Sequence, residues 1–162
     1  MTMTELLEAL YRGQNDRVDE LLAQAPELNV FEAAALGKAD RVRRLLDEDP
    51  SLANTFGDDG FQALGLACFF GHVDAARALV ERGADPNTLA RNPHIQTSAL
   101  HAAAAGENKD SAVRFELCKL LLEHGADPNL RQGQDGFRAI DAARQNGDKE
   151  VELLLVDHGA EG

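Results

Sequence analysis

The chain contains 162 residues, 27% of them charged and 44% hydrophobic, and its formal net charge at pH 7 is −12. This acidic excess repels phosphate groups, so we expect neither nucleic acid nor an anionic membrane as a partner. The sequence has no apolar run of about 18 residues that could span a membrane, and acids near its start disfavour a signal peptide. We therefore expect a cytoplasmic protein in which Cys68 and Cys118 are buried thiols.

Two short helical hairpins are predicted in the first third of the chain. The segments DRVDELL at residues 16–22 and DRVRRLL at residues 40–46 share one frame. Each runs into a turn that contains proline, leucine and asparagine, PELN at 26–29 and PSLAN at 50–54. Gly13 and Gly37 each precede the leucine pair by eight residues, where a glycine would end the first helix of the hairpin.

Three further hairpins follow, and their second helices end in similar sequences. These ends read LVERGADPN at 79–87, LLEHGADPN at 121–129 and LVDHGA at 155–160. In the first of the three, Leu64, Ala67 and Cys68 form one apolar stripe on a short helix that Gly71 ends. A period of about thirty residues indicates stacked units, because no single hairpin can bury both of its faces.

These repeats resemble the ankyrin-repeat family in several short motifs. Ser98–His101 (SALH) is similar to the family's Thr-Pro-Leu-His element, Gly71-His72 to its Gly-His pair, and Gly125–Asn129 (GADPN) to its Gly-Ala-Asp-x-Asn turn. The copies at Gln62–Gly65 and Arg138–Asp141 lack the threonine and histidine of the pattern. The resemblance covers nearly the whole chain and implies an all-α solenoid of helix-turn-helix units with short β-hairpin arms.

We predict one ankyrin-repeat domain over residues 1–162, divided into five units. Their approximate boundaries are 3–29 for an N-terminal cap, 30–59, 60–95, 96–133, and 134–162 for a C-terminal cap. Lys149 and Glu152 replace apolar residues of the earlier copies, and polar side chains there would shield the end of a stack. We therefore expect the stack to be complete.

Aromatic residues collect in the middle of the chain, where the charge is balanced. Phe56, Phe61, Phe69 and Phe70 are four of the seven phenylalanines and lie within 15 positions. The family resemblance implies that Phe61, Phe69 and Phe70 line the concave face, where ligands of this family usually bind. Clustered aromatic residues with few charges are typical of the centre of an interface. The alternative is that one or two of these rings pack against neighbouring arms.

A rim of further residues is expected around this aromatic centre, next to two segments that are longer than their counterparts. The arm at residues 88–99 is three residues longer than the one at 55–63, and Glu107–Ala112 is an insertion between two helices. Insertions in repeat arrays concentrate at binding faces, although surface turns also tolerate them at little cost. Beside the three phenylalanines, the predicted protein-binding residues are Asp58, Asp59, Arg91, His94, Ile95, Gln134, Asp135, Phe137 and Arg138.

Motifs for catalysis are missing from the sequence. It contains no nucleophile elbow, phosphate-binding loop, HExxH or CxxC motif, so we predict no catalytic, cofactor-binding or metal-binding residues. The predicted function is a non-enzymatic module that binds a partner protein in the concave groove centred on the third to fifth units. The partner is unknown, and the acidic flanks favour one with a basic or amphipathic segment. Two alternatives stay open: a homodimer formed through the phenylalanine patch, and a small-molecule or metal-binding scaffold centred on His94.

Overall fold

The computed structural model describes residues 4–24, 26–105, 110–133 and 135–161. Within these ranges it contains ten α-helices and one short 3-10 helix, η1. In chain order they are α1 (Glu5–Tyr11), α2 (Asn15–Ala23), α3 (Val30–Leu36), α4 (Ala39–Glu48), η1 (Pro50–Asn54), α5 (Ala63–Phe70), α6 (Val73–Glu81), α7 (Ala99–Ala104), α8 (Ser111–Glu123), α9 (Ala139–Gln145) and α10 (Lys149–Asp157). None of the described helices is long and apolar enough to cross a membrane.

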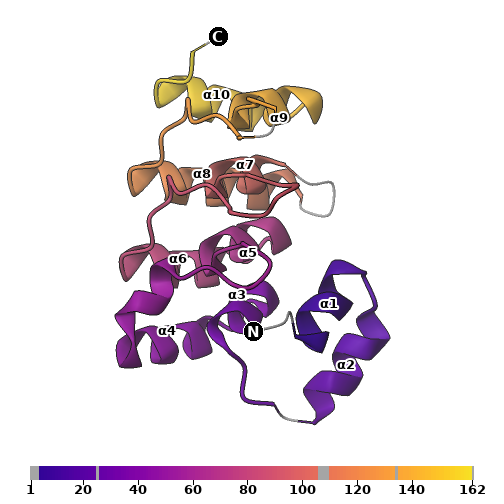
Figure 1. Ribbon diagram of the computed structural model, residues 1–162. Coiled ribbons are helices and arrows are strands. Elements are labelled where there is room, and N and C mark those ends of the chain that lie inside the picture. The colour runs from indigo at the N-terminus through magenta and orange to yellow at the C-terminus, as the bar shows by residue number, and fades with distance from the viewer. Residues whose placement is uncertain (1–3, 25, 106–109, 134, 162) are drawn as a thin grey trace.

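Eight of these helices form a stack of four pairs (Figure 1). The first helices of the pairs, α3, α5, α7 and α9, pack on one another in one row, and the second helices, α4, α6, α8 and α10, form a row beside it. The core lies within this stack, where Leu64, Leu79, Leu100, Leu121 and Ile140 are buried. The all-α solenoid predicted from the sequence is therefore confirmed.

The ends of the helices follow the sequence pattern. Gly71 ends α5 with a positive φ of 81°, a conformation that strains residues with a side chain. Ser98 begins α7, and its hydroxyl accepts a hydrogen bond from the amide of His101. Gln62 stands at the same place before α5 but does not cap that helix, because its side-chain amide donates to the Asn54 carbonyl at 2.9 Å.

Successive units are joined by a repeated asparagine clamp. The side chain of Asn87 donates to the Gly125 carbonyl at 2.9 Å and accepts from the Asp127 amide at 2.7 Å, both at the next helix end. Asn54 and Asn129 each make the same two kinds of hydrogen bond to the turn that follows. The repeated asparagine therefore holds the spacing between neighbouring pairs.

Two further side chains, one half-buried and one buried, also tie units together. The Nε2 of His72 donates to the Ala35 carbonyl at 2.9 Å, so this histidine joins the third unit to the second. Asp148, at the start of α10, accepts from the Ser111 hydroxyl at 3.0 Å and from the Arg114 guanidinium at 2.9 Å, both on α8. The Asp148 side chain is only 2% exposed, so this ion pair is shielded from water.

The first helix pair does not continue the stack. α1 packs on α3, and α2 lies on the far side of α1 and outside the row of α4 (Figure 1). Leu6, Ala9 and Val18 form a small apolar cluster of this pair, whereas Leu7 joins the main core. No arm separates α2 from α3, because Asn29 is itself the N-cap of α3. The PELN and PSLAN turns are therefore similar in sequence but have different roles: PELN leads directly into α3, whereas PSLAN forms η1 and is followed by an arm.

The arms differ from the predicted β-hairpins, since the described residues show almost no strand pairing. A single bridge pairs Phe56 with Gln62. Within this arm the Gly57 amide donates to the Phe61 carbonyl at 2.8 Å, and the arm also bonds to the next one along the stack, where the Arg91 amide donates to the Gly60 carbonyl at 2.8 Å. A Cβ on Gly60 would lie 2.5–2.8 Å from the backbone of Arg91 and Asn92, so only glycine permits this approach.

Candidate functional site

Four aromatic rings from α1, α5 and the arm before α5 meet on the side of the stack where α1 lies. This aromatic cluster consists of Tyr11, Phe61, Phe69 and Phe70. Tyr11 stacks on Phe70 with 6.0 Å between ring centroids, and Phe69 meets Phe70 edge-on at 5.0 Å. Phe69 is 47% exposed, whereas Phe61 and Phe70 are half-buried and pack against the core. The cluster is thus partly packing and partly open surface.

Tyr11 is a member of this cluster to which no repeat motif points. Its ring lies 6.5 Å from that of Phe61, and its hydroxyl donates to Asp59 Oδ2 at 2.7 Å. Burial, together with the hydrogen bond to the Asp59 carboxylate, raises the pKa of Tyr11 well above its usual value. The phenol therefore stays protonated and keeps donating to Asp59 across the physiological pH range.

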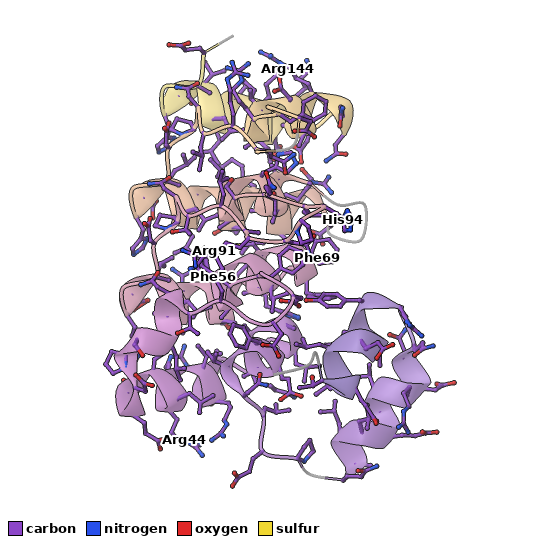
Figure 2. All side chains as sticks on the ribbon, viewed as in Figure 1. Arg44, Phe56, Phe69, Arg91, His94 and Arg144 are labelled. Carbon is purple, nitrogen blue, oxygen red and sulfur yellow. The ribbon has the colours of Figure 1, made fainter. Side chains whose placement is uncertain are left out.

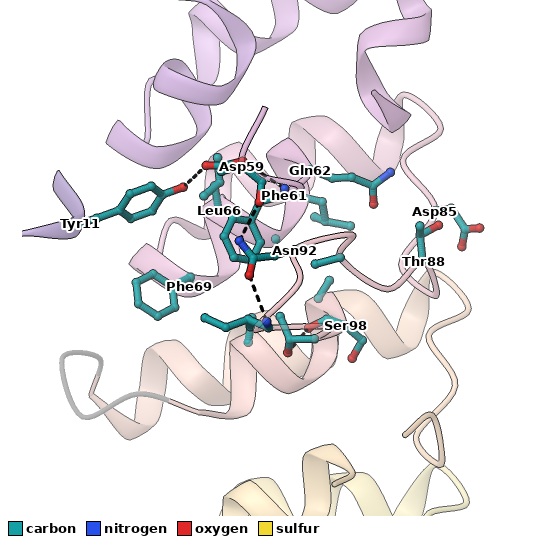
Figure 3. A pocket seen from close by; sticks show the side chains of 17 residues that line it. Tyr11, Asp59, Phe61, Gln62, Leu66, Phe69, Asp85, Thr88, Asn92 and Ser98 are labelled. Carbon is teal, nitrogen blue, oxygen red and sulfur yellow. Dashed lines mark hydrogen bonds between the residues drawn. The ribbon is translucent and has the colours of Figure 1, made fainter. Parts of the chain in front are cut away.

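A pocket of about 420 Å³ opens beside the aromatic cluster, between the α5–α6 pair and the α7–α8 pair (Figure 3). The rings of Tyr11, Phe61 and Phe69 line it together with small and aliphatic residues of α5 and α7, such as Ala102. Ile95, on the long arm before α7, is another lining residue and is 46% exposed. The pocket is large enough to receive a bulky side chain or a small ligand.

The pocket includes a position at which a side chain is missing. Glu32, His101 and Asp141 stand at the third position of α3, α7 and α9, whereas α5 has Gly65 there. A Cβ added to Gly65 meets no other atom within 4 Å, so this position faces open space. The sequence of Gln62–Gly65 shows the departure from the repeat motif, but the resulting pocket becomes visible only when neighbouring units are assembled.

The arms beside the pocket are held by Asn92. Its side-chain amide donates to the Asp59 carbonyl at 2.8 Å, and its side-chain oxygen accepts from the amides of His94 and Ile95 at 2.8 and 3.1 Å. The carboxylate of Asp59 in turn accepts from the Phe61 amide at 3.1 Å. These hydrogen bonds fix the backbone of two arms, and therefore the place of Ile95, without regular strands.

Other predicted residues of these two arms lie outside the described pocket lining. The guanidinium carbon of Arg91 lies 4.0 Å from the centre of the Phe56 ring, a cation–π contact between neighbouring arms (Figure 2). His94 is exposed and lies apart from that pair in the same view. Asp58 is exposed next to Asp59, which does line the pocket. Of the predicted rim, Asp59 and Ile95 therefore come together at the pocket.

A second group of predicted residues lies at the arm before α9. Phe137 is 38% exposed, and Arg138 is half-buried at the start of the helix. The Asp135 carboxylate accepts from the Phe137 amide at 2.9 Å, which lowers the pKa of Asp135. The described members of this group do not line the pocket. Gln134 and residues Glu107–Lys109 of the insertion lie outside the described residues.

Comparison with known proteins places the chain among repeat proteins. A family model described as ankyrin repeats in three copies matches residues 6–90, and another, described as ankyrin repeats in many copies, matches residues 66–115. The chain belongs to the ankyrin-repeat family. Ankyrin repeats indicate a protein–protein interaction module, and the family's fold is a non-enzymatic one. The resemblance read from the short motifs is therefore confirmed.

Several curated ankyrin-repeat proteins are similar to the chain. The "Ankyrin repeat and SAM domain-containing protein 6" of Mus musculus is 31% identical over 157 residues, which cover 93% of this chain and 17% of that protein. A "Putative ankyrin repeat-containing protein" of Treponema pallidum is 34% identical, with 74% and 40% covered. The human "DNA-binding protein RFXANK" is 34% identical, with 59% and 35% covered. The chain thus spans less than half the length of these relatives.

Titratable groups inside this ankyrin-repeat stack serve its structure. Burial lowers the pKa of His72 and of His101, so both imidazoles are uncharged near neutral pH. Cys68 and Cys118 are buried, as the apolar stripes predict. Among the residues that the structure describes, no group of three or more His, Cys, Asp or Glu is placed to hold a metal ion.

Proposed function

We propose that this chain binds a partner protein on the face that carries the aromatic cluster and the arms. The observation that supports this proposal best is that exposed apolar side chains gather around one pocket. Phe69 and Ile95 are 47% and 46% exposed and line the same pocket. Exposed aromatic and aliphatic side chains around a recess are typical of the centre of a protein interface.

The charges around this face favour a partner with a basic or amphipathic segment. Asp59 and Asp85 line the pocket, and Asp58 is exposed next to Asp59. The chain as a whole carries a formal net charge of −12. Such a field speeds the encounter with basic segments and selects against acidic ones, more than it adds affinity. A cytoplasmic site of action fits the two buried thiols.

A rigid face lowers the entropic cost of binding. The clamps of Asn54, Asn87 and Asn129 fix the spacing of the units, and Asn92 fixes the two arms beside the pocket. Because these groups are ordered before the partner arrives, little further conformational freedom is lost on association. A modest apolar centre can therefore support specific binding.

An affinity pull-down read by mass spectrometry tests the proposal with three forms of the chain. These are the native chain, Phe69→Ala and, as a matched control, Leu153→Ala; Leu153 is 61% exposed on α10. We expect a partner that the native chain and the control retain equally and that Phe69→Ala retains at least about fivefold less. Partners captured equally by all three forms would contradict the proposed face.

Self-association is a second candidate, because Phe69, Ile95 and Phe137 are all exposed apolar residues at or beside the arms. A symmetric dimer would bury them against the same residues of a second copy. Sedimentation at micromolar concentration distinguishes the two functions. A dimer that Phe69→Ala converts to monomer would favour self-association, whereas a native monomer favours an external partner.

A further inference from the structure

The pocket beside Gly65 is a recess that belongs to one unit of the repeat. The neighbouring first helices carry Glu32, His101 and Asp141 at the matching position. A Cβ on Gly65 contacts nothing within 4 Å, and Gly65 lies inside helix α5, where glycine is an unfavourable residue. The local sequence therefore leaves room at a point where the helix itself would be more stable with a side chain.

The size and lining of the recess suit an aromatic guest. Its volume of about 420 Å³ lies within the range of sites that receive ring-containing ligands. Tyr11, Phe61 and Phe69 present three rings to it, and aromatic rings pack favourably edge-on or offset against other rings. Such contacts favour a flat aromatic side chain over a branched aliphatic one.

The charge of the lining suits a cation beside that guest. Asp59 and Asp85 are acidic members of the lining, and no lysine, arginine or histidine is among its described residues. The Asp59 carboxylate already accepts hydrogen bonds from the Tyr11 hydroxyl and the Phe61 amide, which fixes it in place. An incoming basic group would therefore meet a negative site whose geometry is set in advance.

We infer that this pocket anchors the partner protein by an aromatic side chain, best a tryptophan, that has lysine or arginine next to it in sequence. The inference rests on the proposed function, and it adds the chemistry of the segment that is bound. Tryptophan and arginine are among the residues that contribute most to protein interfaces. The chain itself contains no tryptophan, so a second copy could not supply this side chain.

Two capped tripeptides test the inference directly, one with tryptophan between two lysines and one with tryptophan between two glutamates. Because the chain has no tryptophan, indole emission reports only the peptide while the protein is titrated. We expect the lysine peptide to bind about three- to tenfold more tightly than the glutamate peptide, as partly exposed charge pairs would give. Equal affinity of the two peptides, or no binding of either, would overturn the inference.

Variants at the pocket show whether the peptide binds there. Gly65→Leu fills the recess and should abolish binding of the lysine peptide, while the matched variant Gly65→Ala adds one methyl and should retain it. Ile95→Ala provides a second test on the surface, with an expected loss of about fivefold and no effect on folding. Unchanged binding by Gly65→Leu and Ile95→Ala would refute the anchor.

The same variants separate this inference from the proposed function. A partner protein whose capture depends on Phe69 but is unaffected by Gly65→Leu would leave the proposed face in place and remove the aromatic anchor. A partner whose capture is insensitive to Phe69→Ala would contradict the proposed face itself. Circular dichroism of each variant confirms that the helical stack is present before binding is compared.

Discussion

The first helix pair and the later stack are built from similar sequences but are held in different ways. The four pairs from α3 to α10 share two continuous rows of packed helices and the asparagine clamps between units. The pair of α1 and α2 contacts the stack through α1, whose Leu7 reaches the main core. Tyr11 adds one hydrogen bond and two ring contacts. Stacking therefore needs more than an amphipathic hairpin.

The missing arm is the physical cause of this difference. Asn54 precedes an arm and uses both groups of its side chain on the Gly83 carbonyl and the Asp85 amide of the next turn. Asn29 instead exchanges hydrogen bonds with Glu32 in a capping box at the start of α3. An asparagine can either begin a helix or clamp a neighbouring unit, and only the second use propagates the stack.

The largest effect on stability is expected from removing the buried interactions of Asp148, which join α10 to α8 and so hold the last two helix pairs together. Asp148→Ala removes acceptors for Ser111 and Arg114 and the N-cap of α10. Breaking such a shielded ion pair costs about 3 kcal/mol, because the Arg114 guanidinium loses the Asp148 carboxylate in a place that water hardly reaches. We expect a fall of this size in the free energy of unfolding, measured by urea denaturation, with the fastest hydrogen exchange in α9 and α10.

The control for this prediction is an ion pair within α10 that is exposed to water. Lys149→Ala removes a contact to Glu152 in which the lysine side chain is 81% exposed. Its effect on the free energy of unfolding should fall within the error of the measurement. An equal effect of Lys149→Ala and Asp148→Ala would show that shielding from water does not matter here.

The clamp can be compared with the cap by two asparagine substitutions. Asn87→Ala loses hydrogen bonds to Gly125 and Asp127 and should cost about 1–2 kcal/mol. Asn29→Ala loses a helix N-cap and should cost about 1 kcal/mol. Hydrogen exchange separates the two, because loss of the clamp should expose the Asp127 amide and loss of the cap only the start of α3. Identical exchange maps would argue against distinct roles.

The repeated part of this fold could be predicted because each copy carries the same signals. Gly37 and Gly71 each lie eight residues before a pair of apolar residues in the following helix, and local residues are enough to set helix ends. The way in which the first pair packs on the stack could not be predicted, because the similar PELN and PSLAN turns have roles that depend on whether an arm follows them. Local similarity therefore does not determine how a pair stacks.

The candidate site could be predicted only in part, because it is assembled from distant segments. Phe69 and Ile95 stand out as apolar residues at positions that face away from the core. Tyr11 reaches Asp59 across 48 positions of sequence, and no periodic pattern encodes such a contact. The space at Gly65 likewise depends on the arms and on α7, so a missing side chain in one motif indicates a recess only after assembly.

Acid should weaken the stack more than the first pair, because His72 and His101, the half-buried histidines whose pKa is lowered, both lie in the stack. Burial lowers the pKa of His72 and His101 below about 6.5, so the unfolded chain takes up protons more readily. Their contribution to stability is complete above the unfolded pKa and decreases as the pH falls through about 6.5. We expect a lower melting temperature at pH 5 than at pH 7.5, because these pH values lie below and above the histidine pKa of the unfolded chain, about 6.5.

The double variant His72→Gln/His101→Gln is the control for this pH dependence. It should be less stable at neutral pH but show a flatter change of melting temperature between the two conditions. Hydrogen exchange should show that acid opens α3, α5 and α7 before α1 and α2. The same slope in the native chain and the double variant would assign the acid sensitivity to other groups.

The smallest expected effect on stability comes from a substitution at Tyr11, which joins the first helix pair to the stack. Tyr11→Phe keeps the ring against Phe61 and Phe70 but removes the hydrogen bond to Asp59, a partly exposed interaction of about 0.5–1 kcal/mol. Since this bond joins α1 to the arm before α5, hydrogen exchange should accelerate in α1 and α2 and stay unchanged from α6 to α10. Uniform acceleration would mean that the first pair unfolds together with the stack. A local change would show that Tyr11 holds an independently opening pair against the aromatic cluster.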